Sequence, residues 1–341
     1  MTAVPAKLAA APATLDPAQV RQVQELKHTS PLIGCRFDPA GRFVFAGSQD
    51  NGVQRWELAT GKKVTLLGHR SWVRGLAFAP ALKLLLSAGW DGRILTWPID
   101  ADAPSPLRSL DAHKGWVRAL AVSPDGKLLA SCGNDHLVKL WSTDQGKLVQ
   151  TLAGHTCHVY NVAFHPSGKF LASADHKGTV KHWDLASGRL VRDLDAAILH
   201  KYDPVFLADH GGIRSMAFNA DGSLLAGTGI TDVSNAFAGI GKPLVVVFDW
   251  QTGKRKQLLV PKENFQGTGW GVAFHPAGFI VGVAGGNNGI LSFWKLDQPQ
   301  AFFTLKLPNN ARDIDLHPDG KRLAIPYFDG SVRIYDLSPK A

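Results

Sequence analysis

Two stretches of the sequence place arginine and tryptophan together at the same spacing. The segment GHRSWVRGLAFAP is followed by AHKGWVRALAVSP, so that the pair Trp72 and Arg74 recurs as Trp116 and Arg118. An arginine guanidinium donates two parallel, charge-assisted hydrogen bonds to a carboxylate or a phosphate, and tryptophan supplies a large apolar face. A surface that presents both residue types would suit the recognition of an acidic group.

These segments belong to a repeat that runs along most of the chain. Each unit contains a short strand followed by a turn, as in LAFAPAL, LAVSPDG and VAFHPSG. The third residue of each such segment is taken as the anchor of its unit, and the anchors are Phe37, Phe78, Val122, Phe164, Phe218, Phe274 and Leu316. They are separated by 41, 44, 42, 54, 56 and 42 residues, and a period of this length is the signature of a repeat architecture.

The units have the pattern of β-structure throughout. Short alternating apolar runs such as KLLASCG are separated by PDG, PSG and SGR turns, and most units carry an aromatic residue 19 positions after the anchor. Four short strands in each unit, repeated radially, form the blade of a β-propeller. The sequence therefore predicts an all-β fold, a seven-bladed β-propeller of four-stranded antiparallel blades.

The units resemble the WD-repeat β-propeller family. A blade of that family carries Gly-His, a buried Ser or Thr, an Asp in a turn and Trp-Asp, and its polar groups form an internal hydrogen-bond network. The resemblance covers about residues 20–338. It implies that the network residues are His69, Ser87, Asp91 and Trp97 in the second blade, His113, Ser131, Asp135 and Trp141 in the third, and His155, Ser173 and Trp183 in the fourth.

Several units depart from the pattern of the family. The first blade keeps His28, Asp50 and Trp56 but has Ala46 at the serine position, and the fourth has Lys177 at the aspartate position. The last three blades lack most of the network residues. Because a satisfied buried network fixes one arrangement of a blade, we expect these blades to be looser or to be held by other contacts.

The seventh unit ends without a fourth strand. The segment VQELKH near the N-terminus aligns with VTLLGH, which occupies the fourth-strand position of the first unit. We therefore expect an N-terminal strand to close the last blade and to remove the open sheet edge. Residues 19–341 are predicted to form a single propeller, preceded by a disordered tail over residues 1–18 that is rich in alanine and proline.

The resemblance also implies a place for the repeated arginine and aromatic side chains. In the family, two positions just before the anchor and the turn between the second and third strands of a blade surround the mouth of the central channel on the top face. Here those positions hold the predicted partner-binding residues Arg74, Arg118, Arg214, Arg312, Trp72, Trp116, Tyr160, Trp270, Trp90 and Phe328. One such residue would more often be structural, but a ring of like charges costs self-repulsion that a structural role need not incur.

Two insertions fall in neighbouring top-face connections, at residues 196–210 and 227–244. Long loops on a rigid scaffold often carry function, whereas neutral insertion into a tolerant loop is the alternative. Their adjacency favours a rim that is shaped for a partner.

The sequence lacks the motifs of common catalytic and cofactor sites. It contains no phosphate-binding loop of the Gly-x-x-x-x-Gly-Lys type, no His-Glu-x-x-His and no Gly-x-Ser-x-Gly. His155, His158 and His176 are expected toward one face, but no carboxylate or cysteine completes a set of three or four converging metal ligands. We therefore predict a protein that is not an enzyme and that holds no cofactor and no metal.

Composition limits the remaining alternatives. The chain of 341 residues has a formal net charge of +9, three separated cysteines and no apolar run long enough to span a membrane. These features suit a cytoplasmic, monomeric propeller that can join a larger complex. We predict a protein-protein interaction scaffold that docks an acidic or phosphorylated peptide segment around the channel.

Two other function classes stay open at this point. Arginine and aromatic residues also suit nucleic acid, although lysine and arginine are spread along this chain rather than clustered in one stripe. A small-molecule enzyme that uses the central channel is the other alternative.

Overall fold

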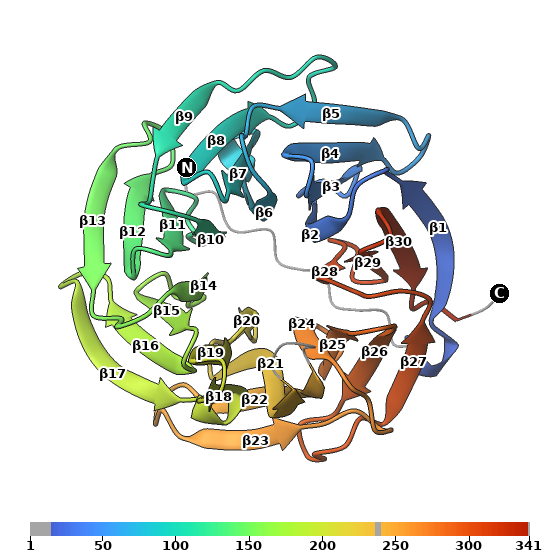
Figure 1. Ribbon diagram of the computed structural model, residues 1–341. Coiled ribbons are helices and arrows are strands. Elements are labelled where there is room, and N and C mark those ends of the chain that lie inside the picture. The colour runs from blue at the N-terminus through green and yellow to red at the C-terminus, as the bar shows by residue number, and fades with distance from the viewer. Residues whose placement is uncertain (1–14, 236–239, 340–341) are drawn as a thin grey trace.

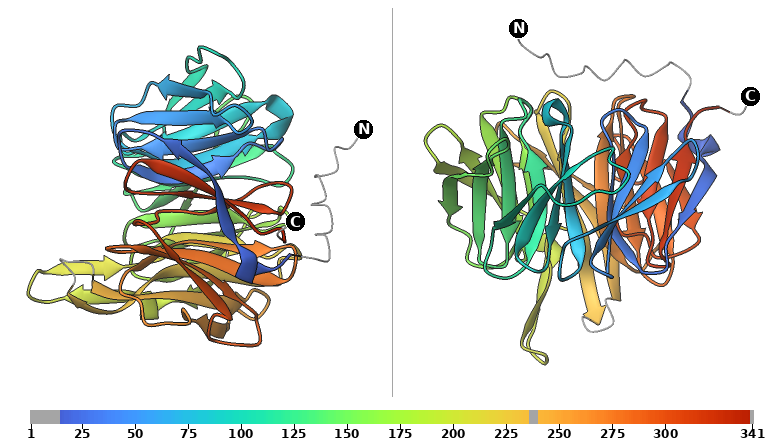
Figure 2. Two further views of the ribbon diagram at one scale, coloured as in Figure 1. Left: turned by 90° about the vertical axis from the view of Figure 1, so that its right-hand side faces the viewer. Right: turned by 90° about the horizontal axis from the view of Figure 1, so that it is seen from above.

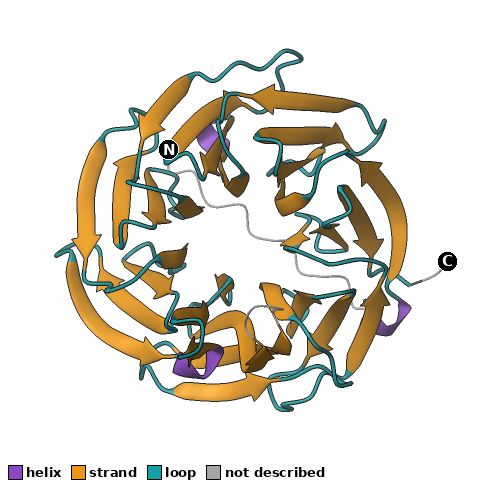
Figure 3. Ribbon diagram, viewed as in Figure 1, coloured by secondary structure: helices purple, strands orange, loops and turns teal. Residues whose placement is uncertain are grey.

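A computed structural model describes residues 15–235 and 240–339. Seven four-stranded antiparallel sheets surround a central channel as the blades of a propeller (Figure 1). Strands make up nearly all of the regular structure, since the helices among the described residues are single turns of 3-10 helix (Figure 3). The predicted fold class is confirmed.

The first four blades follow the chain, and each runs from an inner strand at the channel to an outer strand at the rim. Their strands are β2 (Leu32–Phe37), β3 (Phe43–Ser48), β4 (Gly52–Glu57) and β5 (Lys63–Leu67); β6 (Val73–Ala79), β7 (Leu84–Gly89), β8 (Arg93–Pro98) and β9 (Arg108–Asp111); β10 (Val117–Val122), β11 (Leu128–Gly133), β12 (Leu137–Ser142) and β13 (Leu148–Ala153); and β14 (Val159–Phe164), β15 (Phe170–Asp175), β16 (Thr179–Asp184) and β17 (Arg189–Asp195). The turn η2 (Pro80–Leu82) links β6 to β7.

The last three blades carry the irregular features of the fold. Their strands are β20 (Ser215–Phe218), β21 (Leu224–Asn235), β22 (Ile240–Asp249) and β23 (Arg255–Leu259); β24 (Thr268–His275), β25 (Phe279–Gly285), β26 (Gly289–Trp294) and β27 (Phe303–Leu307); and β28 (Asp315–Leu316), β29 (Arg322–Pro326), β30 (Ser331–Asp336) and β1 (Arg21–Lys27). The seventh blade therefore combines strands from both ends of the chain. The predicted closure by an N-terminal strand is confirmed.

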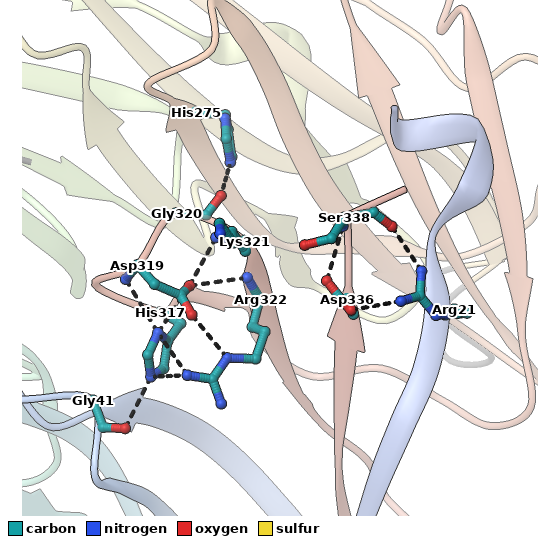
Figure 4. A network of polar contacts seen from close by, with 10 residues as sticks. All are labelled: Arg21, Gly41, His275, His317, Asp319, Gly320, Lys321, Arg322, Asp336 and Ser338. Atoms are coloured by element: carbon teal, nitrogen blue, oxygen red, sulfur yellow. Dashed lines mark hydrogen bonds and ion pairs between the residues drawn. The ribbon is translucent and has the colours of Figure 1, made fainter. Parts of the chain in front are cut away.

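Strand β1 is held in place by side chains as well as by the sheet. Arg21 donates to the Asp336 carboxylate at 2.8 Å and to the Ser338 carbonyl at 2.7 Å (Figure 4). Before β1 lies the turn η1 (Pro17–Gln19), and Leu15 packs against the apolar cluster shared by the sixth and seventh blades. Of the residues assigned to the tail, 15–18 thus adjoin the propeller, and 1–14 lie outside the described residues.

The apolar core lies between neighbouring blades. The third-strand tryptophans Trp56, Trp97 and Trp183 are at most 2% exposed, and each belongs to an apolar cluster that joins strands of two blades. Burying a large aromatic side chain is worth several kcal/mol, so these residues secure the ring of blades.

Histidines join neighbouring blades at the lower ends of the inner strands. His165, His275 and His317 each follow an anchor, and their Nε2 atoms lie 3.1, 2.8 and 2.9 Å from the carbonyl oxygens of Gly222, Gly320 and Gly41 in the next blade. Figure 4 shows the contacts of His275 and His317. Each Nδ1 accepts the backbone N–H two residues further on. Where the Nδ1 of such a ring accepts the backbone N–H, the Nε2 atom is the one left to donate to the carbonyl of the next blade. We call these contacts the histidine latches.

Both insertions form hairpins that project from one face of the propeller (Figure 2). The first contains η3 (Ala197–Leu199), β18 (His200–Asp203) and β19 (Ala208–Gly211), and the second lengthens β21 and β22 beyond the blade. Lys201 donates to the Val233 carbonyl, which ties one hairpin to the other. Residues 236–239 of the second insertion lie outside the described residues.

Candidate functional site

A chain of hydrogen bonds runs through the third blade below the top face. Trp141 Nε1 lies 2.9 Å from Ser131 Oγ, which lies 2.8 Å from His113 Nε2, and His113 Nδ1 lies 2.7 Å from the Asp135 carboxylate. An indole N–H can only donate and an ionised carboxylate can only accept, so Trp141 donates to Ser131 and His113 Nδ1 donates to Asp135. Burial by itself would raise the pKa of Asp135, but the bonds from His113 and from backbone N–H groups lower it to about 2.

The second and fourth blades contain the same chain. In the second, Ser87 lies 2.8 Å from both His69 Nε2 and Trp97 Nε1, and His69 Nδ1 lies 3.1 Å from Asp91. In the fourth, Ser173 lies 2.6 Å from His155 Nε2 and 2.8 Å from Trp183 Nε1.

The carboxylate of the fourth blade comes from a residue that the sequence analysis did not assign. Asp175, not the position of Lys177, accepts from His155 Nδ1 at 2.8 Å. Asp175 also accepts the backbone N–H groups of Lys177 and Thr179, so it caps the same turn from its first residue. Lys177 stands at the aspartate position of the family by spacing, but the carboxylate of the fourth blade is supplied by Asp175, two residues earlier.

Side chains from all seven blades converge on one pocket at the top of the channel, which we call the mouth. Its lining residues are Ile33, Gln49, Trp72, Arg74, Trp90, Arg118, Tyr160, Arg214, Trp270 and Arg312. The two other residues assigned to this surface lie beside the pocket: Trp116 stacks on Trp90, and Phe328, which is 42% exposed, lies against Arg312.

Three tryptophans form a stack on one side of the mouth. The ring centroids of Trp72 and Trp90 are 4.5 Å apart, and those of Trp90 and Trp116 are 3.8 Å apart with their planes nearly parallel, at 5°. Trp90 stands in the turn between β7 and β8 and so bridges the second and third blades. Because these indoles cover one another, they offer less free apolar face to a ligand than three separate side chains would.

The remaining aromatic rings alternate with guanidinium groups. The centre of the Arg118 guanidinium lies 4.4 Å from Trp116 and 4.5 Å from Tyr160, that of Arg214 lies 4.6 Å from Tyr160, and that of Arg312 lies 4.6 Å from Trp270 and 5.0 Å from Phe328. These cation–π contacts hold the planar cations against the rings. A planar guanidinium held in this way binds an oxyanion through its N–H edge.

Arg74 lies across the channel. Its Nη1 donates to the Ile33 carbonyl of the first blade at 3.2 Å, and its Nη2 donates to the Arg214 carbonyl at the start of the fifth blade at 3.3 Å. The side chain begins on the second blade and therefore spans the floor of the mouth. We call it the crossbar.

The arginines of the mouth form no ion pair with a carboxylate among the described residues, although the charge of Asp313 partly offsets the lowering of the Arg74 pKa by burial. Ion pairs between arginine and carboxylate among the described residues involve other arginines, and none involves Arg74, Arg118, Arg214 or Arg312. Burial, followed by the neighbouring arginines, lowers the pKa of Arg118 and of Arg312 to about 10, and burial lowers the pKa of Arg74 as well. The mouth thus concentrates positive charge where water is partly excluded, and this favours an anion.

Two further residues support the mouth, and the sequence analysis did not count them as site residues. Asn134 accepts from Arg118 Nε at 2.8 Å, and the His176 ring stacks on Tyr160 with centroids 4.8 Å apart. Burial and the charge of Arg214 lower the pKa of His176 to about 4, so this ring is neutral near pH 7. Both residues stand at the same turn position as Trp90, and this shared offset was the available signal.

The histidines of the fourth blade do not assemble a metal site within the described residues, where no group of three or more His, Cys, Asp or Glu side chains is placed to hold a metal ion. His155 serves the hydrogen-bond chain, and His158 lies beside His136 with ring centroids 5.5 Å apart. Among the described residues there is also no helix with the length and apolar character needed to cross a lipid bilayer.

Comparison with known proteins agrees with this architecture. Residues 20–57, 61–97, 104–142 and 146–184 match the family described as WD domain, G-beta repeat. These four matched repeats and the seven-bladed fold show that the chain belongs to the WD-repeat β-propeller proteins.

The curated relatives are similar over short stretches. The chain is 34% identical over 79 residues to the nuclear distribution protein PAC1 of Tuber melanosporum, which is 22% of this chain and 18% of the relative. It is 38% identical over 66 residues to the kinesin-like protein KIF21B of Mus musculus, which is 19% of this chain and 4% of the relative. The match thus spans less than a fifth of either relative. A WD-repeat propeller with such relatives is consistent with a protein-interaction scaffold.

Proposed function

We propose that this propeller is a non-catalytic scaffold that docks an acidic or phosphorylated segment of a partner protein over its mouth. One observation carries the proposal: the guanidinium groups of Arg74, Arg118, Arg214 and Arg312 share one pocket without a carboxylate partner among the described residues. A carboxylate or phosphate brought to this place gains charge-assisted hydrogen bonds and relieves the repulsion among the arginines.

The ring contacts of the arginines support tight recognition. A free arginine side chain loses conformational freedom when it binds, but Arg118 is already held between Trp116 and Tyr160 and by its bond to Asn134. Preorganisation of this kind lowers the entropic cost of binding. Arginine and tryptophan are also the residue types that most often dominate the energy of protein interfaces.

The projecting hairpins support a protein partner rather than a small anion alone. At the tip of the first hairpin, Val205 is 82% exposed and Leu207 is 76% exposed. Asp203 accepts the backbone N–H of Val205 at 2.9 Å and so orders the turn that presents them. We propose that this tip adds apolar contact to a partner segment whose acidic part lies in the mouth.

The first experiment removes charge from the mouth. The double variant Arg118→Ala with Arg312→Ala should bind a fluorescein-labelled peptide of alternating Glu and phosphoserine at least tenfold more weakly, because two of the anion-binding side chains are lost. The matched control is Arg189→Ala with Arg255→Ala, which removes the same charge from exposed positions on the outer strands β17 and β23. An equal loss in the control, or collapse of thermal stability in the double variant, would contradict the proposal.

The second experiment tests the hairpin. Two probe peptides carry the same Glu-phosphoserine cluster, and one of them continues through five further residues to a Leu-Leu pair. Val205→Ser with Leu207→Ser should weaken the longer peptide and leave the shorter one unchanged. If both peptides bind this variant as they bind the wild type, the hairpin has no part in docking.

Nucleic acid is a weaker candidate because the indole faces on which a base would stack are covered by each other at Trp72, Trp90 and Trp116. A labelled oligothymidine measured in the same assay decides between the two classes: binding tighter than that of the acidic peptide would favour nucleic acid.

We also propose that the protein acts in the cytoplasm as a monomeric propeller, alone or within a larger complex. Its cysteines support a reducing compartment, since Cys35 and Cys132 are buried as free thiols.

A further inference from the structure

A second cavity lies in the channel below the crossbar, and we call it the lumen. Its volume is about 300 Å³, and its polar lining residues are Arg36, Arg74, Arg118, Asn161, Arg214, Ser215 and Asp313. The rest of the lining near the arginines is small, with Gly75 and Ala119 on the inner strands. The lining continues down to Pro124 and Phe164 at the lower ends of β10 and β14, on the side away from the mouth.

The charges that face the lumen do not balance. Arg36 donates to Asp313 at 2.7 Å and lies 4.0 Å from Asp315, so Arg36 has its own carboxylates. Arg74, Arg118 and Arg214 have none within ion-pair distance among the described residues. Asp313 is in addition committed to backbone N–H groups of Cys35 and Ile314. The lumen is therefore a partly enclosed space with an excess of positive charge.

Hydrogen-bond donors also remain unused there. Arg74 spends two donors on the Ile33 and Arg214 carbonyls, and Arg214 Nε is buried without any acceptor. A buried donor without a partner is costly, and a buried guanidinium without a counter-charge is more so. An oxyanion in the lumen supplies both the missing acceptor and the missing charge.

We propose that the lumen is a binding site for a small free oxyanion of the phosphate or sulfate class, which enters from the side of Pro124. The crossbar separates this site from the mouth, because Arg74 is bonded to blades on both sides of the channel. A peptide docked on the top face therefore meets the upper edges of the arginines, whereas a free anion reaches their lower edges. The inference does not depend on the identity of the docking partner.

The test measures thermal unfolding of the full chain in potassium chloride, phosphate and sulfate at equal ionic strength. Phosphate and sulfate should raise the Tm above its value in chloride, by about 2 °C for each tenfold rise in concentration beyond the dissociation constant. An equal Tm in all three salts overturns the proposal.

Matched variants locate the ion. Ala119→Asp places a carboxylate in the lumen at the level that carries Asp313 in the seventh blade, and Ala119→Asn places a neutral group of the same size there. The aspartate variant should have a higher Tm without phosphate and should lose the phosphate effect, whereas the asparagine variant should keep more of it. An identical phosphate effect in the two variants places the ion elsewhere and overturns the proposal.

A third variant separates this inference from peptide docking. Arg312 lines the mouth but not the lumen, so Arg312→Ala should weaken the phosphoserine peptide and keep the phosphate-dependent rise in Tm. Loss of that rise in Arg312→Ala would assign the ion to the mouth. If the phosphoserine peptide binds and free phosphate has no specific effect, docking on the mouth stands and the lumen site does not.

Discussion

The substitution Arg312→Met tests whether the positive charge of the mouth is kept at the expense of stability. The Arg312 guanidinium lies over Trp270 and Phe328, and its Nε is buried without an acceptor. Burial, with the charges of Arg74 and Arg214, lowers its pKa from 12.5 to about 10. Each pKa unit corresponds to about 1.4 kcal/mol, so holding this charge costs on the order of 3 kcal/mol.

Methionine keeps an unbranched apolar chain over the two rings and removes the charge. Two cation–π contacts are lost, at about 0.5–1 kcal/mol each, so the free energy of unfolding should rise by about 1–2 kcal/mol. The assay is urea unfolding in chloride buffer, with Arg189→Met on the exposed face of β17 as a control that should stay within about 0.5 kcal/mol of the wild type. A saturating acidic peptide should stabilise the wild type more than the variant.

A fall in stability of about 1 kcal/mol or more in Arg312→Met would refute this reasoning. The arginine would then stabilise the fold by its own contacts, and the absence of a carboxylate beside it would no longer be evidence for an anionic binding partner. A gain in stability together with weaker peptide binding is the combination that a functional charge requires.

Three further substitutions test other parts of the structure. Ser131→Ala removes the hydroxyl that links two buried ring nitrogens in the third blade, and it should lower the free energy of unfolding by about 2–4 kcal/mol in a urea titration; a neutral effect would show that the hydrogen-bond chain is dispensable. His182 stacks on Trp250 with both ring nitrogens buried and unpartnered, and burial lowers its pKa from 6.5 to about 4. The unfolded chain therefore takes up the proton first, and the free energy of unfolding of the wild type should fall by up to about 3 kcal/mol as the pH drops from 6.5 to 4. His182→Phe should remove this fall, and parallel pH profiles of the two proteins would contradict the prediction. His275→Leu breaks the histidine latch to Gly320 and should cost about 1–3 kcal/mol, and an unchanged unfolding midpoint would show that the latch is incidental.

Much of the fold could be predicted because each repeat is defined by short local sequence patterns. Turn residues and alternating apolar residues indicate the strands of each blade. The missing fourth strand of the seventh unit, together with the segment VQELKH, predicts that β1 closes the last blade. Asp175 was missed because the aspartate position was counted at a fixed offset from His155. A carboxylate reaches the same imidazole from Asp175 because both positions border one tight turn, which a linear count does not represent.

The residues that form the histidine latches are visible in the sequence, but their role in joining neighbouring blades was not predicted. A His-Pro pair follows the anchor as His165, His275 and His317, while the other units have different residues there. The bond crosses from one blade to the next, so no pattern within a single unit could reveal its acceptor.

The sequence predicted which residues line the candidate site better than it predicted how their side chains are arranged. Residues at shared offsets meet at the mouth because the blades are related by rotation about the channel. The direction of each side chain was not predictable: Arg74 reaches the Arg214 carbonyl 140 positions away, and Trp90 leans onto the neighbouring blade. Arg36 of the lumen had a signal, since it and the neighbouring Asp315 stand where the five other units have alanine.

The two sides of the mouth rest on different supports, and this difference bears on how a partner is held. In the third blade, Trp116 follows three residues after His113, whose hydrogen-bond chain fixes the loop between them. The same spacing separates Trp72 and His158 from the network histidines of their blades. Arg214, in contrast, follows directly from the projecting hairpin, and within the described part of the chain no such hydrogen-bond chain lies beneath it. Because a buried, satisfied network resists rearrangement and an exposed hairpin does not, the tryptophan side should set the position of the bound anion, and the hairpin side should adjust to the rest of the partner.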